Sequence, residues 1–254
     1  MTRRAAPALA AALAAALALP ARAQEPAAAA PDPRAVLAHF VAAVGGAEAL
    51  ARTTPRRETG RMEIAAANLT VRYEAWYADG RTYTRSEMPG LGVVRTGFDG
   101  AVAWVINPAT GPALLEGVAL RQAAQAADPL AAVHPARFVA GLEALADTVF
   151  EGEACHALRV TTAWGERYSE FFDRETGLLA GSLRTQVTPQ GSIPVTSHVV
   201  EWRTVGAARL PGVTRTRMLG REFVSTVDST VLGPVPDSLF ALPPEIHALL
   251  GGGR

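Results

Sequence analysis

The feature that most constrains the fold is a long succession of alternating segments over residues 56–232. Within these segments apolar side chains recur at every second position, as over residues 69–77, which is the period of a β-strand with one buried face. Turn-forming pairs such as Asp79-Gly80 and Asp99-Gly100 separate successive segments. Because such short connections join neighbouring antiparallel strands, the pattern predicts a meander of about eleven or twelve strands.

Two alanine-rich segments, one before the strand pattern and one within it, predict helices. The first begins with Asp32 as N-cap and Pro33 at the first helical position, and apolar residues over 36–44 recur at helical spacing. The second, residues 117–147, lies between the fifth and sixth predicted strands and has no run of β-branched residues. It predicts about two or three short helices, the last with an apolar face that includes Leu142.

A sheet of this size encloses more space than its own side chains fill. Sheets of more than about ten strands curl, split or close, and a barrel of about eight strands is the size that side chains fill. Only 6% of the residues are aromatic, so large side chains are scarce. We therefore expect the interior to be occupied by the alanine-rich helices, by a ligand, or by both in turn.

The N-terminal residues carry the pattern of an export signal. Residues 1–23 predict a cleaved signal peptide, because arginines precede an apolar stretch that ends in the small-residue site Ala21-Arg22-Ala23. A linker over 24–33 then leads into a single domain over 34–250, and the tail 251–254 is expected to be disordered. No later apolar segment reaches the roughly 20 residues that span a bilayer. We expect a periplasmic protein without a transmembrane segment in its mature part.

Charge and motif content exclude several functional classes. The 24 basic residues are balanced by 24 acidic ones, whereas a nucleic-acid-binding protein needs a basic surplus. There is no lysine, which excludes Schiff-base and Walker-type chemistry. The sequence contains no dinucleotide fingerprint, and its five histidines lack metal-ligand spacing. We expect no cofactor, no metal and no nucleic acid partner, and we expect a monomer.

The residue types that carry catalysis are present only in weak arrangements. Cys155-His156 is the only adjacent pair of a nucleophile and a base, and neighbours in a strand point to opposite faces. We therefore interpret Cys155 as a buried, unreactive thiol. Glu166 and Glu170 are four strand residues apart, about 13 Å, which is too far for a pair of carboxylates that act together. We expect a solvated face for both carboxylates and a protein that is not an enzyme.

Four segments resemble one family of exported proteins. They are the helix AVLAHFVAAVGGAEAL over 35–50, the MPGLG…R-x-G-x-D-G-x-x-A-W region over 88–104, the F-D-x-x-T-G-L-L turn over 172–179 and PDSLF-x-LP over 236–243. In this order they resemble the LolA/LolB-like outer-membrane lipoprotein-sorting proteins. The resemblance implies a mainly β fold with helices: a large antiparallel half-open β-barrel with an N-terminal helix and a helical lid over an apolar cavity. The resemblance does not extend to individual functional residues.

The resemblance and the missing catalytic motifs favour a carrier of lipoprotein acyl chains or other lipids. An envelope protein-interaction or sensor module with the same fold is the alternative, and an enzyme with Cys155 as its nucleophile is a third possibility. The sequence leaves open which strand face points inward, because a shift of one residue in register inverts it. The candidate lining residues are apolar positions of the strands and the lid: Leu69, Val71, Tyr73, Val102, Trp104, Ile106, Phe138, Leu142, Phe171, Met218 and Phe223.

Overall fold

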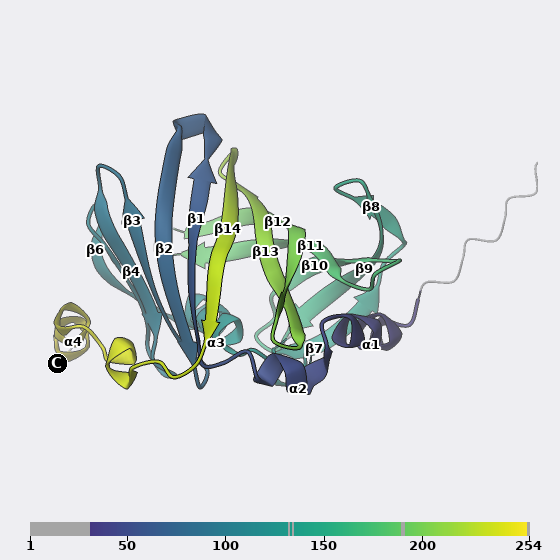
Figure 1. Cartoon of the computed structure of the whole chain (residues 1–254), viewed down its shortest axis with the longest axis horizontal. Coiled ribbons are helices and arrows are strands. Elements are labelled where there is room, and N and C mark those ends of the chain that lie inside the picture. The colour runs from purple at the N-terminus through teal and green to yellow at the C-terminus, as the bar shows by residue number, and fades with distance from the viewer. Residues whose placement is uncertain (1–30, 132, 134, 189–190, 253–254) are drawn as a thin grey trace, which may run out of the picture.

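The structure of the protein is a computed structural model that describes residues 31–131, 133, 135–188 and 191–252 (Figure 1). The predicted signal peptide, most of the predicted linker and residues 253–254 of the predicted tail lie outside the described residues. Within the described part of the chain, no helix is both long enough and apolar enough to cross a bilayer.

The described strands form one antiparallel sheet of fourteen strands. The strands are β1 Arg56–Ile64, β2 Leu69–Ala78, β3 Arg81–Met88, β4 Gly92–Phe98, β5 Ala103–Asn107, β6 Gly111–Leu115, β7 Val139–Ala144, β8 Thr148–Phe150, β9 Glu153–Thr162, β10 Arg167–Asp173, β11 Leu179–Thr188, β12 Gly191–Val205, β13 Ala208–Met218 and β14 Arg221–Leu232. Their order is β6-β5-β4-β3-β2-β1-β14-β13-β12-β11-β10-β9-β7, with β8 paired to β9. The sequence therefore predicted most strands correctly, and β6 and β7 are the two that it missed.

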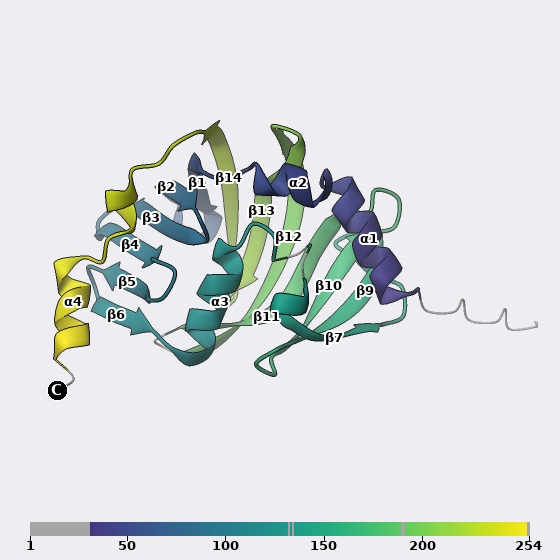
Figure 2. The same ribbon diagram turned by 90° about the horizontal axis from the view of Figure 1, so that it is seen from below.

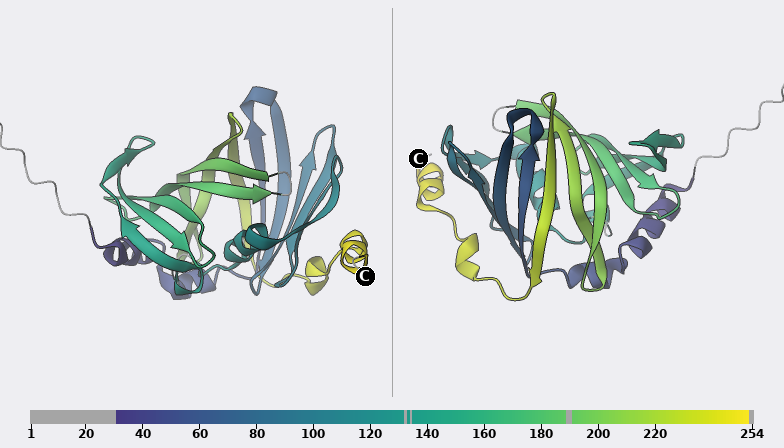
Figure 3. Two further views of the ribbon diagram at one scale, coloured as in Figure 1. Left: turned by 180° about the vertical axis from the view of Figure 1, so that it is seen from behind. Right: turned by 45° about the horizontal axis from the view of Figure 1, so that its top comes forward.

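Two meanders meet where the first strand pairs with the last. The register runs from Arg56 opposite Leu232 to Glu63 opposite Val224, so β1 and β14 lie side by side although they are far apart in sequence (Figure 3). The sheet is not closed into a barrel, because the path ends at β6 on one side and at β7 on the other. The observed architecture is the predicted large, half-open antiparallel sheet with helices.

The helices are α1 Pro33–Ala43, α2 Gly46–Ala51, α3 Gly117–Ala127 and α4 Pro244–Gly251, with the 3-10 turns η1 Ala65–Ala67, η2 Pro135–Arg137 and η3 Asp237–Phe240. The predicted start of the first helix is confirmed, since Asp32 Oδ1 accepts a hydrogen bond from Arg34 N at 3.0 Å and Pro33 is the first helical residue. Gly45 then takes φ 100°, a left-handed conformation suited to glycine, and it separates α1 from α2.

The helical segment between the two meanders is shorter than predicted. Residues 111–115 form an additional strand, β6, which pairs with β5 as a hairpin. The α-helix α3 therefore lies between the sixth and seventh strands and not between the fifth and sixth. The predicted last helix, which was to carry Phe138 and Leu142, is wrong: residues 139–144 form β7. Leu142 pairs with Val160 of β9 there, so backbone hydrogen bonds to a free sheet edge override a spacing that also suits a helix.

Helices α1 and α3 lie on the same face of the curved sheet (Figure 2). Phe40 of α1 packs in one buried cluster with Leu158 of β9 and Phe172 of β10. The α3 residue Ala127 packs in another cluster with Phe98 of β4 and Ala103 of β5. These strand residues share one face by register, so the expectation that helices occupy part of the interior is confirmed. We call this side of the sheet the helix-covered face.

Candidate ligand-binding cavity

Two adjoining hollows lie between α1, α3 and the strands at the β7 end of the sheet. The first chamber has a volume of about 210 Å³ and is walled by α1, α3, β7, β9, β10 and β11. The second chamber, of about 600 Å³, lies between α1, β7 and the segment that precedes β7. Leu37, Val139 and Leu142 line both chambers. The second volume alone falls within the roughly 300–1,000 Å³ typical of small-molecule sites.

Aliphatic and aromatic side chains form most of the first chamber's wall. Leu142 of β7 is paired with Val160 of β9, which is paired in turn with Tyr168 of β10, so all three project from the helix-covered face. Phe40 of α1 contacts Phe172 edge-on, with ring centroids 5.4 Å apart. This aromatic contact packs α1 against β10 beside the first chamber. The lining side chains leave an apolar wall that a ligand can contact.

One end of the first chamber is polar. Glu170 is paired with Ser182, which places the Glu170 side chain on the same face as Arg184, two residues further along β11. The Arg184 guanidinium lies over the ring of Tyr168, 4.7 Å from its centroid. Arg184 Nε and Nη2 are buried and have no hydrogen-bond partner among the described residues. The chamber therefore combines an apolar wall with a guanidinium whose Nε and Nη2 have no hydrogen-bond partner in the described part of the chain.

Burial shifts the titration of the groups at this polar end. Desolvation raises the pKa of Glu170 to about 7, and the positive charge of Arg184 offsets only part of this effect. Desolvation likewise raises the pKa of Tyr168 to about 12, so its hydroxyl stays protonated at neutral pH. The predicted solvated position of Glu170 is therefore wrong, because its strand presents it to the cavity under α3.

In addition to the apolar packing of Ala127, one glutamine of α3, Gln122, makes hydrogen bonds to the sheet. Gln122 Nε2 donates to Thr185 O at 2.9 Å and to Glu166 Oε1 at 2.8 Å. Its Oε1 accepts from Val187 N at 3.1 Å and from Gln186 Nε2 at 3.3 Å. The pairing of β10 with β11 extends only to Ser169 and Leu183, so the Gln122 amide satisfies backbone groups of β11 beyond the end of that ladder. This contact fixes one wall of the first chamber.

The predicted lining residues fall into three groups. Leu142 lines both chambers, and Met218 lines a separate hollow beside β11. Four others are on the helix-covered face but away from the chambers, at β2 and β14. These are Leu69, Val71, Tyr73 and Phe223.

The remaining predicted residues lie elsewhere. Trp104 and Ile106 of β5 are on the opposite face, since their neighbour Ala103 packs against α3. Phe171 is also on that face, stacked on Phe150 with centroids 4.3 Å apart. Val102 lies in the turn before β5, where its N–H donates to Asp99 Oδ1, and Phe138 precedes β7 without lining either chamber.

Sequence reasoning missed most of the residues that do line the chambers. They include Leu37 and Phe40 of α1, Gln122 of α3, and Tyr168, Glu170 and Arg184 of the sheet. The alternation of Tyr168, Glu170 and Phe172 contained a usable signal, since it places all three on one face. The sequence alone nevertheless favours a solvated face, because it does not reveal which helix covers these residues.

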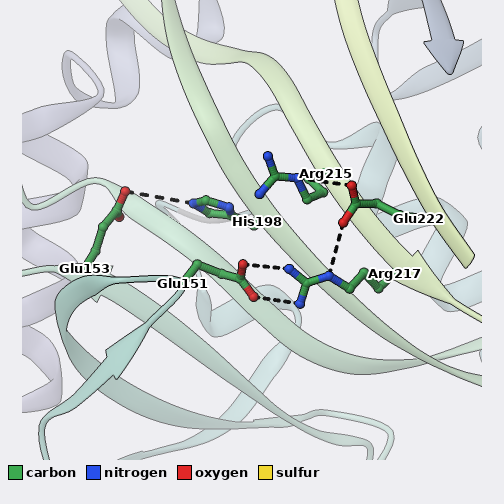
Figure 4. A network of polar contacts seen from close by, with 6 residues as sticks. All are labelled: Glu151, Glu153, His198, Arg215, Arg217 and Glu222. Atoms are coloured by element: carbon green, nitrogen blue, oxygen red, sulfur yellow. Dashed lines mark hydrogen bonds and ion pairs between the residues drawn. The ribbon is translucent and has the colours of Figure 1, made fainter. Parts of the chain in front are cut away.

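A polar network lies on the opposite face of the sheet (Figure 4). Glu151, in the turn between β8 and β9, binds Arg217 of β13 through both oxygens, at 2.7 and 2.8 Å. Glu222 joins Arg217 to Arg215, at 3.3 and 3.6 Å. Arg215 and Arg217 are therefore both paired with carboxylates, and Arg217 attaches the β8–β9 turn to the sheet.

The cysteine is placed as the sequence predicted. Cys155 is fully buried on the face opposite the helices, with Phe150 and Phe171 in its cluster. Burial raises the pKa of its thiol to about 11, which leaves almost no thiolate at neutral pH. His156 instead contacts Asp147, with Nδ1 2.8 Å from Oδ1. Within the described residues, no group of three metal-ligating side chains lies close enough together to hold a metal ion.

Comparison with protein-family models finds no family that matches the sequence, and comparison with curated proteins finds no match either. Solved structures do resemble the fold. A DUF1329 family protein from Desulfovibrio piger superposes with a TM-score of 0.54 at 10% identity, over 83% of this chain and 98% of that chain. A LolA superfamily protein from Nitrosomonas europaea gives a TM-score of 0.52 at 13% identity, over 84% and 99% of the two chains.

A third structure is named as an outer membrane lipoprotein-sorting protein domain and comes from Vibrio parahaemolyticus. It superposes with a TM-score of 0.50 at 9% identity, over 82% of this chain and 97% of that chain. At such low identity the likeness establishes the fold alone. The chain therefore has a LolA-like fold, as the four sequence segments predicted.

Proposed function

We propose that this LolA-like protein is a non-enzymatic periplasmic carrier that holds an acyl chain of a lipoprotein or another lipid in its two adjoining chambers. The observation that carries the proposal is the pair of hollows lined jointly by Leu37, Val139 and Leu142, under helices that cover one face of an open sheet. The names of the structural neighbours, which include a lipoprotein-sorting domain, support the same class of cargo.

The energetics of apolar burial suit such a site. Each buried methylene contributes about 0.8 kcal/mol, so a long acyl chain contributes on the order of 10 kcal/mol before costs. Association and ordering cost several kcal/mol, and this leaves a net affinity without any catalytic group. The chambers supply the concave apolar surface that this mode of binding requires.

We propose that the protein acts in the periplasm. The predicted signal peptide would deliver the chain to the periplasm, where lipid or lipoprotein cargo must be shielded from water. We propose that it acts there as a monomer in the transport of cargo for outer membrane biogenesis. An envelope protein partner is part of the proposal only as the receiver or donor of that cargo.

The test is uptake of a fluorescent fatty acid, cis-parinaric acid, by the purified protein. Leu142→Trp replaces a leucine that lines both chambers with a bulky indole ring, so we expect this variant to lose most of the uptake. The matched control is Leu249→Trp, because Leu249 is an exposed residue of α4 outside both chambers. No uptake by the unaltered protein, or equal uptake by the two variants, would refute the proposal.

Native mass spectrometry of the protein purified from cells supplies a second measurement. We expect a mass increment from co-purified lipid that Leu142→Trp removes. A pull-down that yields a stoichiometric protein partner, together with a lipid-free mass, would instead establish the alternative function of an interaction or sensor module.

A further inference from the structure

We infer that the cargo is an amphiphile with an anionic oxygen headgroup, a carboxylate or a phosphate, which binds Arg184 at the polar end of the first chamber. This inference rests on the proposed carrier function and adds the chemistry of the headgroup. It follows from the surroundings of Arg184, from the neighbouring acid Glu170 and from the residues that line both chambers.

Arg184 has hydrogen-bond donors that no described residue accepts. A guanidinium carries five N–H donors and no acceptor, and buried arginines are normally paired. The Nε and Nη2 atoms of Arg184 are buried and lack a hydrogen-bond partner among the described residues, and the group rests only on the Tyr168 ring. An oxygen anion in the chamber would satisfy these donors, and carboxylates and phosphates both bind a guanidinium through paired hydrogen bonds.

The acids near Arg184 do not neutralise it fully. Glu166 is engaged elsewhere, since it accepts hydrogen bonds from Gln122 and from Trp164 Nε1. Glu170 faces the same chamber, but burial raises its pKa to about 7, so about half of it is uncharged at neutral pH. In the uncharged form Glu170 donates a hydrogen bond, and the polar end then has a net positive charge that suits an anion.

The other walls add no negative charge. The side chains that α1, β7 and β9 contribute to the chamber are apolar, and α3 contributes the amides of Gln122 and Gln125. On its other side Arg184 borders a separate hollow whose only titratable lining residues besides Arg184 are Arg167 and Arg217. Arg184 and Glu170 are therefore the two groups whose charges determine how the chamber receives a headgroup.

Aliphatic walls that the two chambers share offer a place for the apolar tail. Leu142 and Val139 line the first chamber, which contains Arg184, and also the larger second chamber. A ligand whose head binds Arg184 would therefore extend its chain past Leu142 into the space under α1. The second chamber is lined mainly by aliphatic and small side chains, with Asp32 and Arg34 as its charged residues. A polar end at Arg184 and aliphatic walls at Leu37, Val139 and Leu142 match a single-headed amphiphile better than an uncharged lipid.

The test compares three ligands that share a sixteen-carbon chain: palmitate, hexadecanol and palmitoyl-lysophosphatidic acid. Each is titrated against the purified protein loaded with the neutral fluorescent probe N-phenyl-1-naphthylamine, and displacement gives its affinity. We expect palmitate or the lysophosphatidic acid to bind about 10- to 100-fold more tightly than hexadecanol, as charged hydrogen bonds allow. The tighter of the two acids identifies the headgroup as carboxylate or phosphate.

Two variants assign the effect to the polar end. Arg184→Met should remove most of the preference for acids and leave hexadecanol binding unchanged, whereas Arg121→Met, at an exposed position of α3, should alter neither. Palmitate affinity should fall as the pH rises from 6 to 8, because Glu170 becomes charged. Glu170→Gln should abolish this dependence.

The outcomes separate this inference from the carrier function on which it rests. If none of the three ligands displaces the probe, the carrier function fails. If all three displace it equally, and Arg184→Met changes nothing, the protein carries lipids but does not recognise an anionic head. Retained hexadecanol binding by Arg184→Met shows that the variant is folded.

Discussion

Gln122 and Gln125 provide an internal comparison of how α3 is held against the sheet. Both lie on one helix and both face the first chamber, yet only Gln122 reaches the backbone of β11. Gln122→Ala removes four hydrogen bonds and leaves Thr185 O and Val187 N without partners. Each hydrogen bond is worth about 0.5–1.5 kcal/mol net, and water that reaches the exposed side of β11 recovers part of the loss.

We therefore expect Gln122→Ala to lower the free energy of unfolding by about 2 kcal/mol. Gln125→Ala should lower it by about 1 kcal/mol or less, because the buried Oε1 of Gln125 has no partner to lose and its side chain makes one hydrogen bond, with Tyr168. The helix propensities of the two substitutions are identical, so the difference isolates the contact with β11.

Urea unfolding followed by circular dichroism measures both changes, and a thermal scan should show Gln122→Ala melting about 4–8 °C lower. Equal destabilisation by the two substitutions would refute the assignment of Gln122 as the residue that attaches the helix. A change in the slope of the urea transition would indicate that the denatured state had been altered instead.

Three further predictions test other parts of the structure. Glu170→Gln should stabilise the protein at pH 8 and change its stability little at pH 4. Folding raises the pKa of Glu170 from 4.5 to about 7, so ionisation of this carboxyl is disfavoured in the native state. The free energy of unfolding of the unaltered protein therefore falls as the pH rises through this window, by up to about 3 kcal/mol. An opposite sign in pH-dependent urea midpoints would contradict the burial of this group. Gly97→Ala should lower the free energy of unfolding by about 1–3 kcal/mol, since its Cβ would lie 2.5 Å from the buried Trp104 ring. Gly141→Ala is the control in the same thermal scan, because a Cβ there has no neighbour closer than 3.8 Å. Cys155 should resist iodoacetamide at pH 8 until urea unfolds the chain, and rapid labelling of the native protein would show that the thiol is accessible.

The local features of this fold were predictable because local residues encode them. Asp32 and Pro33 mark the start of α1 by capping chemistry, and Asp79-Gly80 forms the predicted turn between β2 and β3. The alternation over β2 follows from the pleat of a strand and needs no knowledge of its neighbours. The burial of Cys155 away from His156 follows from the same alternation.

The cavity could not be predicted in this way, because its position depends on pairings between distant segments. β7 is a strand only because β9 offers a free edge, although its sequence also suits a helix. Trp104 and Val71 both alternate correctly, but only the register across β2 to β5 shows that they project from opposite faces.

The sequence by itself determined that this chain forms a large antiparallel sheet with an N-terminal helix, since strand period, turn residues and caps act within a few positions. Only the tertiary structure decided where the sheet is hollow and which polar groups face the hollow. Glu170 illustrates the reason: a carboxylate on an alternating strand is equally compatible with water or with a cavity. Its environment is set by α3, which lies more than forty residues away in the chain and is held over it by Gln122.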